Sequence, residues 1–418
     1  MSDVGVQVST NRDALAHNSL FEWPYSLNME ALLARGWRPV PFHDFILKIH
    51  ARCDLSCDYC YMYRSADQGW RERPRVMSPT VASQAVSRIG EHVRTHVLSG
   101  VNVTLHGGEP LLAGPELITH VVRAVRRETG GATARIQIQT NGVRLTETYL
   151  RLFDQLDVRV GVSLDGDRAA HDAHRRDAGG RGSYDAISRA LRRLAGGSFA
   201  HLYAGLLCVV DPRRDPIATY EALLTFTPPS VDFLLPHGNW SAPPPLRQEG
   251  SPRRPYGKWL IAVFDHWYDA SRKLTRIRLF EEIINGLLGG TPHAESLGLE
   301  PDRIVVVETD GAIERSDALK SAYEGAAATG LNVVDASFDD ALRLPVVAGG
   351  QLGYEGLSKT CRACAIARVC GGGMYAHRYR RGSGFANPSV YCADLYLLIG
   401  HIRRRVARDV VALRAGLR

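Results

Sequence analysis

The stretch His50-Ala-Arg-Cys53-Asp-Leu-Ser-Cys57-Asp-Tyr-Cys60-Tyr61 places three cysteines within eight residues. Three residues separate the first pair of cysteines, and two residues separate the second pair. Three thiolates can hold three irons of a four-iron cube, so the fourth iron keeps an open coordination position. A zinc site is the alternative, although structural zinc prefers four protein ligands and paired C-x-x-C knuckles. Motifs elsewhere in the sequence are needed to distinguish the iron–sulfur interpretation from the zinc interpretation.

The chain is long enough for two or three packed units with a hydrophobic core, since it has 418 residues of which 45% are hydrophobic. No apolar segment follows Met1, and no apolar run approaches the ~18 residues that span a bilayer, so we expect a cytoplasmic protein without a membrane partner. Seven of the eight cysteines fall in two groups, and only Cys208 stands alone. In a reducing compartment, such groups favour metal or iron–sulfur binding over disulfides.

The formal net charge is +7, from 51 basic and 44 acidic residues. Much of the basic excess is arginine in helix-like segments such as 189–193 and 403–405, and solvated helix faces explain it. The sequence contains no basic patch interleaved with aromatic residues. We therefore expect no nucleic-acid partner.

Six apolar segments with the alternation of strands are separated by segments with helical periodicity. The expected strands are 45–49, 101–105, 136–138, 158–162, 202–210 and 231–236, and the expected helices between them are 81–98, 115–128, 145–156, 183–195 and 215–226. Strands that alternate with helices predict an α/β fold with a parallel sheet and right-handed crossovers. Six units rather than eight predict an open, partial (β/α)6 barrel. Polar or glycine-rich residues follow the strands, at the end where β/α barrels assemble their active sites.

The chain divides into four predicted regions. Residues 1–40 form an N-terminal extension, and residues 41–240 form the partial barrel. Residues 241–300 combine a proline-rich loop with bridging helices, because prolines cluster up to residue 255 and helical periodicity follows. Residues 301–418 form a C-terminal module that carries the second cysteine group and a final helix.

Three motifs in this order resemble those of radical S-adenosylmethionine (SAM) enzymes: the three-cysteine stretch, Gly107-Gly-Glu-Pro110 and Ser163-Leu-Asp165. The resemblance implies that Cys53, Cys57 and Cys60 hold a [4Fe–4S] cluster whose open iron binds S-adenosyl-L-methionine. One electron from such a cluster cleaves the cofactor and yields a 5′-deoxyadenosyl radical, which abstracts hydrogen from unactivated C–H bonds.

The same resemblance implies a set of cofactor contacts at successive strand ends. Gly107 and Gly108 would let the backbone approach the amino group of the cofactor, and Glu109 would place a carboxylate near it. The remaining contacts would come from Ser163 and Asp165, which point the same way because they are two residues apart, from Arg175 with Arg176 as its rival, and from Tyr59 and Asn141. Taken singly, the alternatives are a turn for Gly-Gly-Glu-Pro, a helix cap for Asp165 and surface charge for Arg175.

The second cysteine group resembles the SPASM module of peptide-modifying radical SAM enzymes. It consists of Cys361, Cys364, Cys370 and Cys392. Four thiolates close all four iron positions of a cube, so a second, auxiliary [4Fe–4S] cluster here would transfer electrons or organise structure. Zinc remains the alternative, because four thiolates also satisfy it.

The module departs from the fuller pattern at two positions. Ser316 and Met374 stand where that pattern has cysteines, so we expect the first auxiliary cluster to be absent and one auxiliary cluster to remain. Asp317 matches the aspartate that is the catalytic base in sulfatase-maturing enzymes, although it could instead cap a turn. His237, after the sixth strand, is the second candidate base.

A closer resemblance, from about Trp23 to Arg404, is to the FxsB-type maturases of ribosomal peptides. It rests on 45–61, on Ala66-Asp-Gln-Gly-Trp70-Arg and on Cys370-Gly-Gly-Gly-Met-Tyr-Ala-His-Arg-Tyr. It implies a ribosomally synthesised precursor peptide as partner, an external electron donor such as flavodoxin or ferredoxin, and a cyclophane crosslink between an aromatic ring and the β-carbon of a nearby residue. The alternatives are thioether formation, a sulfatase-maturase-like side-chain oxidation, and a non-catalytic iron–sulfur or zinc scaffold.

Overall fold

The computed structural model describes residues 23–414 and residue 416. The predicted extension 1–40 therefore lies partly outside the described residues. Its described part contains the short helix α2 (Met29–Ala34), which begins after Asn28, whose side chain accepts a hydrogen bond from the Ala31 N–H at 2.9 Å.

The ten strands among the described residues form one sheet in the order β10-β9-β8-β1-β2-β3-β4-β5-β6-β7. The strands of the six expected units lie side by side in chain order and pair in parallel. They are β1 (Asp44–His50), β2 (Gly100–Gly107), β3 (Thr133–Thr140), β4 (Arg159–Ser163), β5 (Tyr203–Val209) and β6 (Ser230–Leu234), and β7 (Arg276–Ile277) follows β6. The predicted partial (β/α)6 barrel is confirmed.

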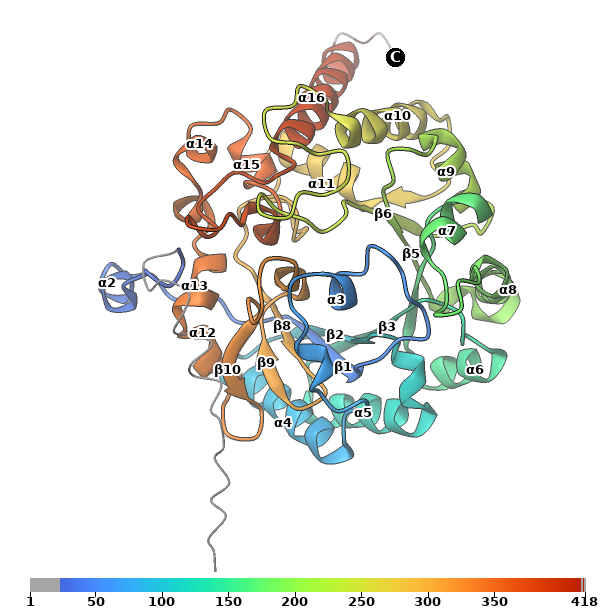
Figure 1. Cartoon of the computed structure of the whole chain (residues 1–418), viewed down its shortest axis with the longest axis vertical. Coiled ribbons are helices and arrows are strands. Elements are labelled where there is room, and N and C mark those ends of the chain that lie inside the picture. The colour runs from blue at the N-terminus through green and yellow to red at the C-terminus, as the bar shows by residue number, and fades with distance from the viewer. Residues whose placement is uncertain (1–22, 415, 417–418) are drawn as a thin grey trace, which may run out of the picture.

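Helices cover the outer face of this sheet (Figure 1). They are α4 (Pro79–Thr95), α5 (Pro115–Glu128), α6 (Glu147–Gln155), α8 (Tyr184–Ala195) and α9 (Pro216–Leu224). Phe45, Leu47 and Ile49 of β1 are fully buried in the core beneath them. The sequence analysis did not predict α7 (Arg168–His174), a two-turn helix that begins where the Asp167 carboxylate accepts a hydrogen bond from the Ala170 N–H at 2.8 Å.

The C-terminal region adds three strands to the same sheet. β8 (Ile304–Val307) pairs in parallel with β1, with Asp44 opposite Ile304, so β1 has a neighbour on each side. β9 (Ala312–Glu314) and β10 (Ala328–Asn332) continue the sheet in antiparallel. Strands from both sides of the predicted boundary at residue 300 thus belong to one sheet.

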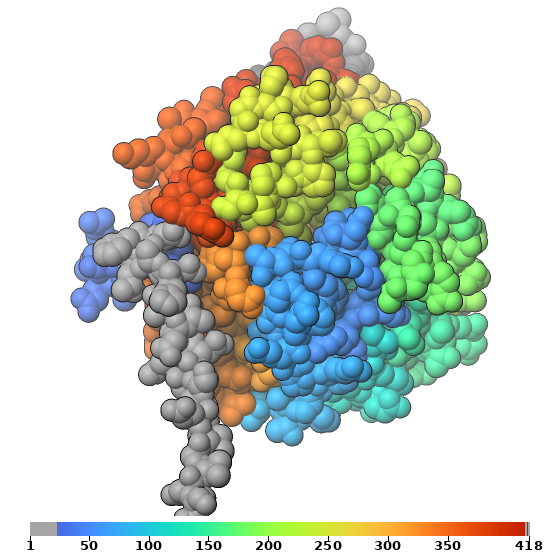
Figure 2. Space-filling model, viewed as in Figure 1, coloured from blue at the N-terminus to red at the C-terminus, as the bar shows by residue number. Residues whose placement is uncertain are grey.

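The remaining helices are α3 (Tyr61–Arg64), α10 (Pro255–Asp269), α11 (Arg278–Leu287), α12 (Phe338–Leu342), α13 (Pro345–Gln351), α14 (Lys359–Arg362), α15 (Ala367–Cys370) and α16 (Cys392–Arg414). The proline-rich loop before α10 packs on the C-terminal region, since the Trp240 indole N–H donates to the Pro388 carbonyl at 2.7 Å. Figure 2 shows this yellow-green loop beside red-orange residues of the C-terminal region. In the described part of the chain, no helix is long and apolar enough to cross a membrane.

Candidate active site

A cavity of about 330 Å³ lies at the carboxyl ends of the parallel strands. Its wall combines the three-cysteine loop with residues that follow the other strands and with the start of the C-terminal region. The predicted site residues on this wall are Cys53, Cys57, Tyr59, Cys60, Gly107, Gly108, Asn141, Ser163, Arg175, His237 and Asp317. Segments that are far apart in the sequence thus meet around one space, as expected for this end of a β/α barrel.

The three-cysteine loop leaves β1 and ends in α3, which Figure 1 shows in front of the sheet. The Cys53 thiol accepts hydrogen bonds from the Leu55 N–H at 3.4 Å and from the Asn141 side-chain amide at 3.6 Å. Burial raises the pKa of all three thiols, that of Cys57 to about 11. Without a metal these groups are neutral, and bound iron would supply the positive charge that a thiolate needs in this position.

Gly107 and Gly108 bring the end of β2 against the cluster loop itself. The Gly108 N–H donates to the His50 carbonyl at 2.8 Å, and the Glu109 N–H donates to the Arg52 carbonyl at 2.9 Å. A Cβ at Gly107 would lie 2.2 Å from the His50 oxygen, and one at Gly108 would lie 2.5 Å from the Arg52 oxygen. These two glycines are therefore required by the packing of the loop, whatever else approaches them.

Glu109 is fully buried and does not line the cavity, so the structure does not place it with the other predicted cofactor contacts. Its carboxylate accepts hydrogen bonds from the Leu111 N–H, the Thr140 hydroxyl and the Asn141 N–H, at 3.0, 2.7 and 2.8 Å. Burial raises the pKa of Glu109 to about 7 despite these bonds. The residue ties the end of β2 to the end of β3.

Asp165 is also buried behind the cavity wall, where it holds two residues that do line the cavity. Its Oδ2 accepts hydrogen bonds from the Tyr59 hydroxyl and from Arg175 Nε, the latter at 2.8 Å, and its Oδ1 accepts from the Val209 N–H at 3.0 Å. Burial opposes ionisation, but the Arg175 guanidinium holds the pKa of Asp165 below its ordinary value. Arg176 is exposed and absent from the wall, so Arg175 is the arginine available to a ligand.

Both candidate bases lie on the cavity wall. Asp317 Oδ2 lies 2.6 Å from the Lys48 ammonium, while its Oδ1 is buried without a hydrogen-bond partner among the described residues. Burial lowers the pKa of His237 to about 4, so its imidazole is neutral at pH 7. The His237 ring lies between Tyr61 and His377, at centroid distances of 4.6 and 5.8 Å.

Sequence reasoning missed several residues of this site: Lys48, Tyr61, His106, Glu295 and His377. Lys48 carried the clearest signal, because it is a charged residue inside the apolar strand 45–49. The position that departs from the cysteine pattern, Ser316, lies on the cavity wall, where its hydroxyl donates to Glu295 Oε1 at 2.5 Å. Met374, the other departure, lies on the same wall.

The second cysteine group encloses a separate cavity of about 50 Å³. Cys361 lies in α14, Cys370 is the last residue of α15, and Cys392 is the first residue of α16. The ends of these three helices therefore meet at the cavity. Burial raises the pKa of Cys370 to about 12. The four thiols thus share one small cavity, whereas the three N-terminal thiols line the larger cavity.

In the described part of the chain, the groups of three or more His, Cys, Asp or Glu ligand atoms within 4.8 Å of one another contain no cysteine.

Comparison with known proteins agrees with this geometry. Residues 47–207 match the family model of the radical SAM superfamily. This part of the chain is similar to the radical SAM superfamily. It contains the three-cysteine loop, the Gly107-Gly108 turn and the Ser163–Asp165 strand end, as the sequence analysis predicted.

Similarity to known proteins extends beyond residues 47–207 and covers most of the chain. A serine-type anaerobic sulfatase-maturating enzyme of Klebsiella aerogenes is 25% identical over 415 residues, covering 92% of this chain and 91% of the relative. A structure of native anSMEcpe with bound AdoMet superposes with a TM-score of 0.71 at 22% identity, covering 88% of this chain and 99% of that one. Streptococcus suis SuiB bound to precursor peptide SuiA gives a TM-score of 0.58 at 13% identity, covering 94% and 84%. The α/β fold with its partial radical SAM barrel is shared with these structures.

Proposed function

We propose that this protein is a radical SAM enzyme that modifies a side chain of a peptide. The observation that carries the proposal is the shared cavity: the wall that holds the three cysteines also holds Asp317, from a segment more than 250 residues later. A group that removes a hydrogen atom and a group that accepts a proton would thus face the same substrate. That combination suits oxidation of a carbon centre.

A peptide substrate is supported by the relatives. The similar structures include native anSMEcpe with bound AdoMet and Cp18Cys peptide, and SuiB bound to precursor peptide SuiA. The relatives that match most of this chain are anaerobic sulfatase-maturating enzymes of the serine type. We take the precursor peptide to be ribosomally made.

S-adenosylmethionine and a [4Fe–4S] cluster on Cys53, Cys57 and Cys60 would, when bound, supply one-electron hydrogen abstraction at an unactivated carbon. The residues of the chain bind and orient this cofactor. Arg175, fixed by Asp165, offers a guanidinium whose other nitrogens can hold a carboxylate. Tyr59, Asn141 and Ser163 supply polar groups beside it on the same wall.

The C-terminal cysteines would hold one auxiliary [4Fe–4S] cluster, which accepts or passes on the electron released by the substrate. The four thiols line one small cavity, and four thiolates would leave no iron position of a cube for a substrate. An external carrier such as flavodoxin or ferredoxin would exchange electrons with the enzyme. Asp317, with His237 as its rival, would take the proton.

Side-chain oxidation of the sulfatase-maturase type is the reaction that the comparisons favour, because those relatives match 92% of the chain. A cyclophane crosslink is the second candidate, supported by the resemblance of segments 45–61, 66–71 and 370–379 to the FxsB-type maturases. Both reactions remove one hydrogen atom, then one proton and one electron, from the peptide. They therefore use the same set of groups in this cavity.

The proposal is tested with anaerobically reconstituted protein and two sets of synthetic peptides. One set carries a single serine or cysteine, and the other carries an aromatic residue followed two positions later by a residue with β-hydrogens. We expect about eight irons per chain, from two four-iron clusters, and 5′-deoxyadenosine that is formed with the modified peptide. Zinc in the C-terminal site would refute the auxiliary cluster, and absence of 5′-deoxyadenosine with every peptide and a reductant would favour the scaffold alternative.

The product identifies the reaction. An oxidised serine or cysteine becomes an aldehyde that reacts with hydroxylamine. A cyclophane loses two hydrogens, is inert to hydroxylamine and resists fragmentation between the two linked residues. A thioether consumes a cysteine thiol, so alkylation with iodoacetamide separates it from the cyclophane.

A further inference from the structure

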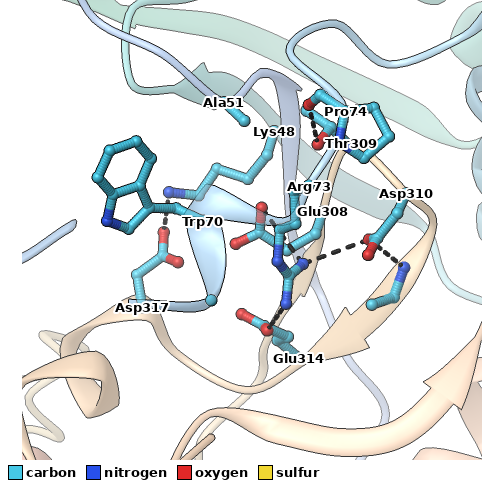
Figure 3. Close-up of polar contacts among 12 residues, drawn as sticks. Lys48, Ala51, Trp70, Arg73, Pro74, Glu308, Thr309, Asp310, Glu314 and Asp317 are labelled. Atoms are coloured by element: carbon cyan, nitrogen blue, oxygen red, sulfur yellow. Dashed lines mark hydrogen bonds and ion pairs between the residues drawn. The ribbon is translucent and has the colours of Figure 1, made fainter. Parts of the chain in front are cut away.

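Lys48 is a fully buried lysine on β1, and none of the proposed cofactor contacts uses it. It lies on the opposite face of the strand from Leu47 and Ile49, so its side chain points into the barrel. Its ammonium lies 2.6 Å from Asp317 Oδ2 and 3.3 Å from the Met62 sulfur. In Figure 3 the side chains of Lys48 and Asp317 point toward each other. A buried ammonium requires such a partner, because removing it from water unpaired is costly.

The two carboxylate oxygens of Asp317 differ in their bonding partners. Oδ2 is held by Lys48, whereas Oδ1 is buried and has no hydrogen-bond partner among the described residues. Buried carboxylate oxygens are normally satisfied, so an unpartnered one calls for a functional explanation. A carboxylate that is fixed through one oxygen and free at the other can accept a proton without first breaking a bond.

Two other cations near Asp317 form ion pairs with the neighbouring carboxylates. Lys320 lies 2.9 Å from Glu308 Oε1 and 2.5 Å from Glu314 Oε2. Arg73 lies 2.5 Å from Glu314, 3.3 Å from Asp310 and 3.5 Å from Glu308, and Figure 3 shows it between these three acids. Although burial raises it, Lys320 and Lys48 lower the pKa of Glu308 to about 2. Glu308, Glu314 and Asp310 are each in contact with Lys320 or Arg73, whereas the contact of Lys48 is with Asp317.

The chain that follows α3 is attached to the segment that carries Asp317. The Asp67 N–H donates to the Lys320 carbonyl at 3.1 Å, and the Asp67 carboxylate accepts from the Gly325 N–H at 2.9 Å. Asp67 belongs to the Ala66–Arg71 motif. This motif therefore links the chain after the cysteine loop to the chain after Asp317.

We propose that Lys48 is a positioning residue for Asp317, which it holds through Oδ2 so that Oδ1 is directed at the substrate. The inference rests on the proposed function, in which the substrate radical is oxidised. In that step a C–H or O–H bond of the substrate breaks, the proton goes to Asp317 Oδ1, and the electron would go to the one-electron acceptor that the C-terminal cysteines would hold. Without Lys48, no cation would contact Asp317 Oδ2, while Glu308 and Glu314 would still have carboxylate oxygens within 4.8 Å of its own.

The test compares three substitutions with the wild-type holoenzyme: Lys48→Gln, Lys48→Arg and Asp317→Asn. Glutamine keeps a hydrogen-bond donor without the charge, and arginine keeps the charge. The measured quantity is the ratio of modified peptide to 5′-deoxyadenosine, for a peptide on which the wild type is active, together with its pH profile. Iron content and thermal unfolding identify a variant that fails to fold, in which case Lys48→Met replaces Lys48→Gln.

We expect the ratio to fall about 10-fold to 100-fold for Lys48→Gln and Asp317→Asn, the range of a lost general base, and to stay within about threefold for Lys48→Arg. The acidic limb of the pH profile should move to higher pH in Lys48→Gln, because the carboxylate has lost its cation. The groups facing Asp317 that could also titrate are Tyr61, His106, His237, Glu295, Glu308, Glu314 and Lys320.

An unchanged ratio and pH profile in Lys48→Gln, with Asp317→Asn impaired, would overturn the role of Lys48 and leave the base in place. An unchanged ratio in Asp317→Asn would instead refute Asp317 as the base. Loss of the ratio in Lys48→Arg as well as Lys48→Gln, without a shift of the pH profile, would mean that Lys48 only fills space. The failures of the two proposals are thus distinguishable.

Discussion

The two cysteine sites of this chain differ in what surrounds the thiols. The three N-terminal thiols form part of the wall of a cavity of about 330 Å³ that polar groups from five strand ends also line. The four C-terminal thiols line a cavity of about 50 Å³ where the ends of three helices meet. The first cavity has room for a ligand beside the thiols, and the second has much less. The number of cysteines points to the same difference, because three thiolates leave one iron of a four-iron cube open and four thiolates leave none.

The largest expected effect is loss of the open site. Cys60→Ala should reduce 5′-deoxyadenosine formation by more than about 10³-fold, because the radical chemistry requires the cluster, and should lower iron from about eight to about four per chain. Liquid chromatography and iron analysis measure both. Cys208→Ala is the matched control, since Cys208 is buried on β5 and lines neither cavity. Activity in Cys60→Ala comparable to that control would contradict the assignment.

Loss of the C-terminal cysteine site should separate formation of 5′-deoxyadenosine from modification of the peptide. Cys364→Ala should also leave about four irons per chain, but it should still form 5′-deoxyadenosine. The yield of modified peptide should fall about 10-fold or more, because the electron from the substrate has lost its acceptor. If 5′-deoxyadenosine disappears in this variant too, the two sites do not act independently.

A smaller effect should distinguish two adjacent arginines. Arg175→Gln should raise the KM for S-adenosylmethionine about 10-fold to 100-fold, the cost of a lost charge-assisted hydrogen bond. Arg176→Gln should leave it within about twofold, because Arg176 is exposed and lies outside the cavity. Initial rates at varied cofactor concentration give both values. Equal effects of the two substitutions would remove Arg175 from the cofactor site.

The last expected effect is on stability rather than on activity, and it concerns the support behind the open site. The pKa of Glu109 rises from 4.5 to about 7 on burial, so the folded protein holds this proton more tightly than the unfolded chain. Its contribution to stability is complete below pH 4.5 and is lost as the pH rises to 7, by about 3 kcal/mol. Urea unfolding of the metal-free protein should show this loss relative to Glu109→Gln. The exposed Glu116→Gln should behave as the wild type.

Local patterns in the sequence predicted much of this architecture. Alternating apolar residues such as Phe45, Leu47 and Ile49 mark each strand, and the motifs at the strand ends place the residues that line the open cavity. Glu109 and Asp165 are exceptions. A sequence motif shows that a carboxylate is needed at a strand end. It does not show whether that carboxylate faces the cavity or the hydrogen-bond donors behind the cavity wall.

The pairing of Lys48 with Asp317 could not be predicted in the same way. It depends on β8 returning to the side of β1, and no local period of the sequence determines which strands become neighbours over such a separation. The lysine in an apolar strand and the acidic residues Glu308 and Glu314 are each visible in the sequence. That these residues lie close enough to balance one another's charges is visible only in the fold.

The position of β1 between β2 and β8 has a consequence for biosynthesis. During translation, β1 has an unpaired edge until residues 304–307 have left the ribosome. The same residues bring the segment that carries Asp317, so the cysteine loop gains its final surroundings only after about three quarters of the chain has been made. A cluster bound by this loop would therefore reach its final surroundings only late in translation.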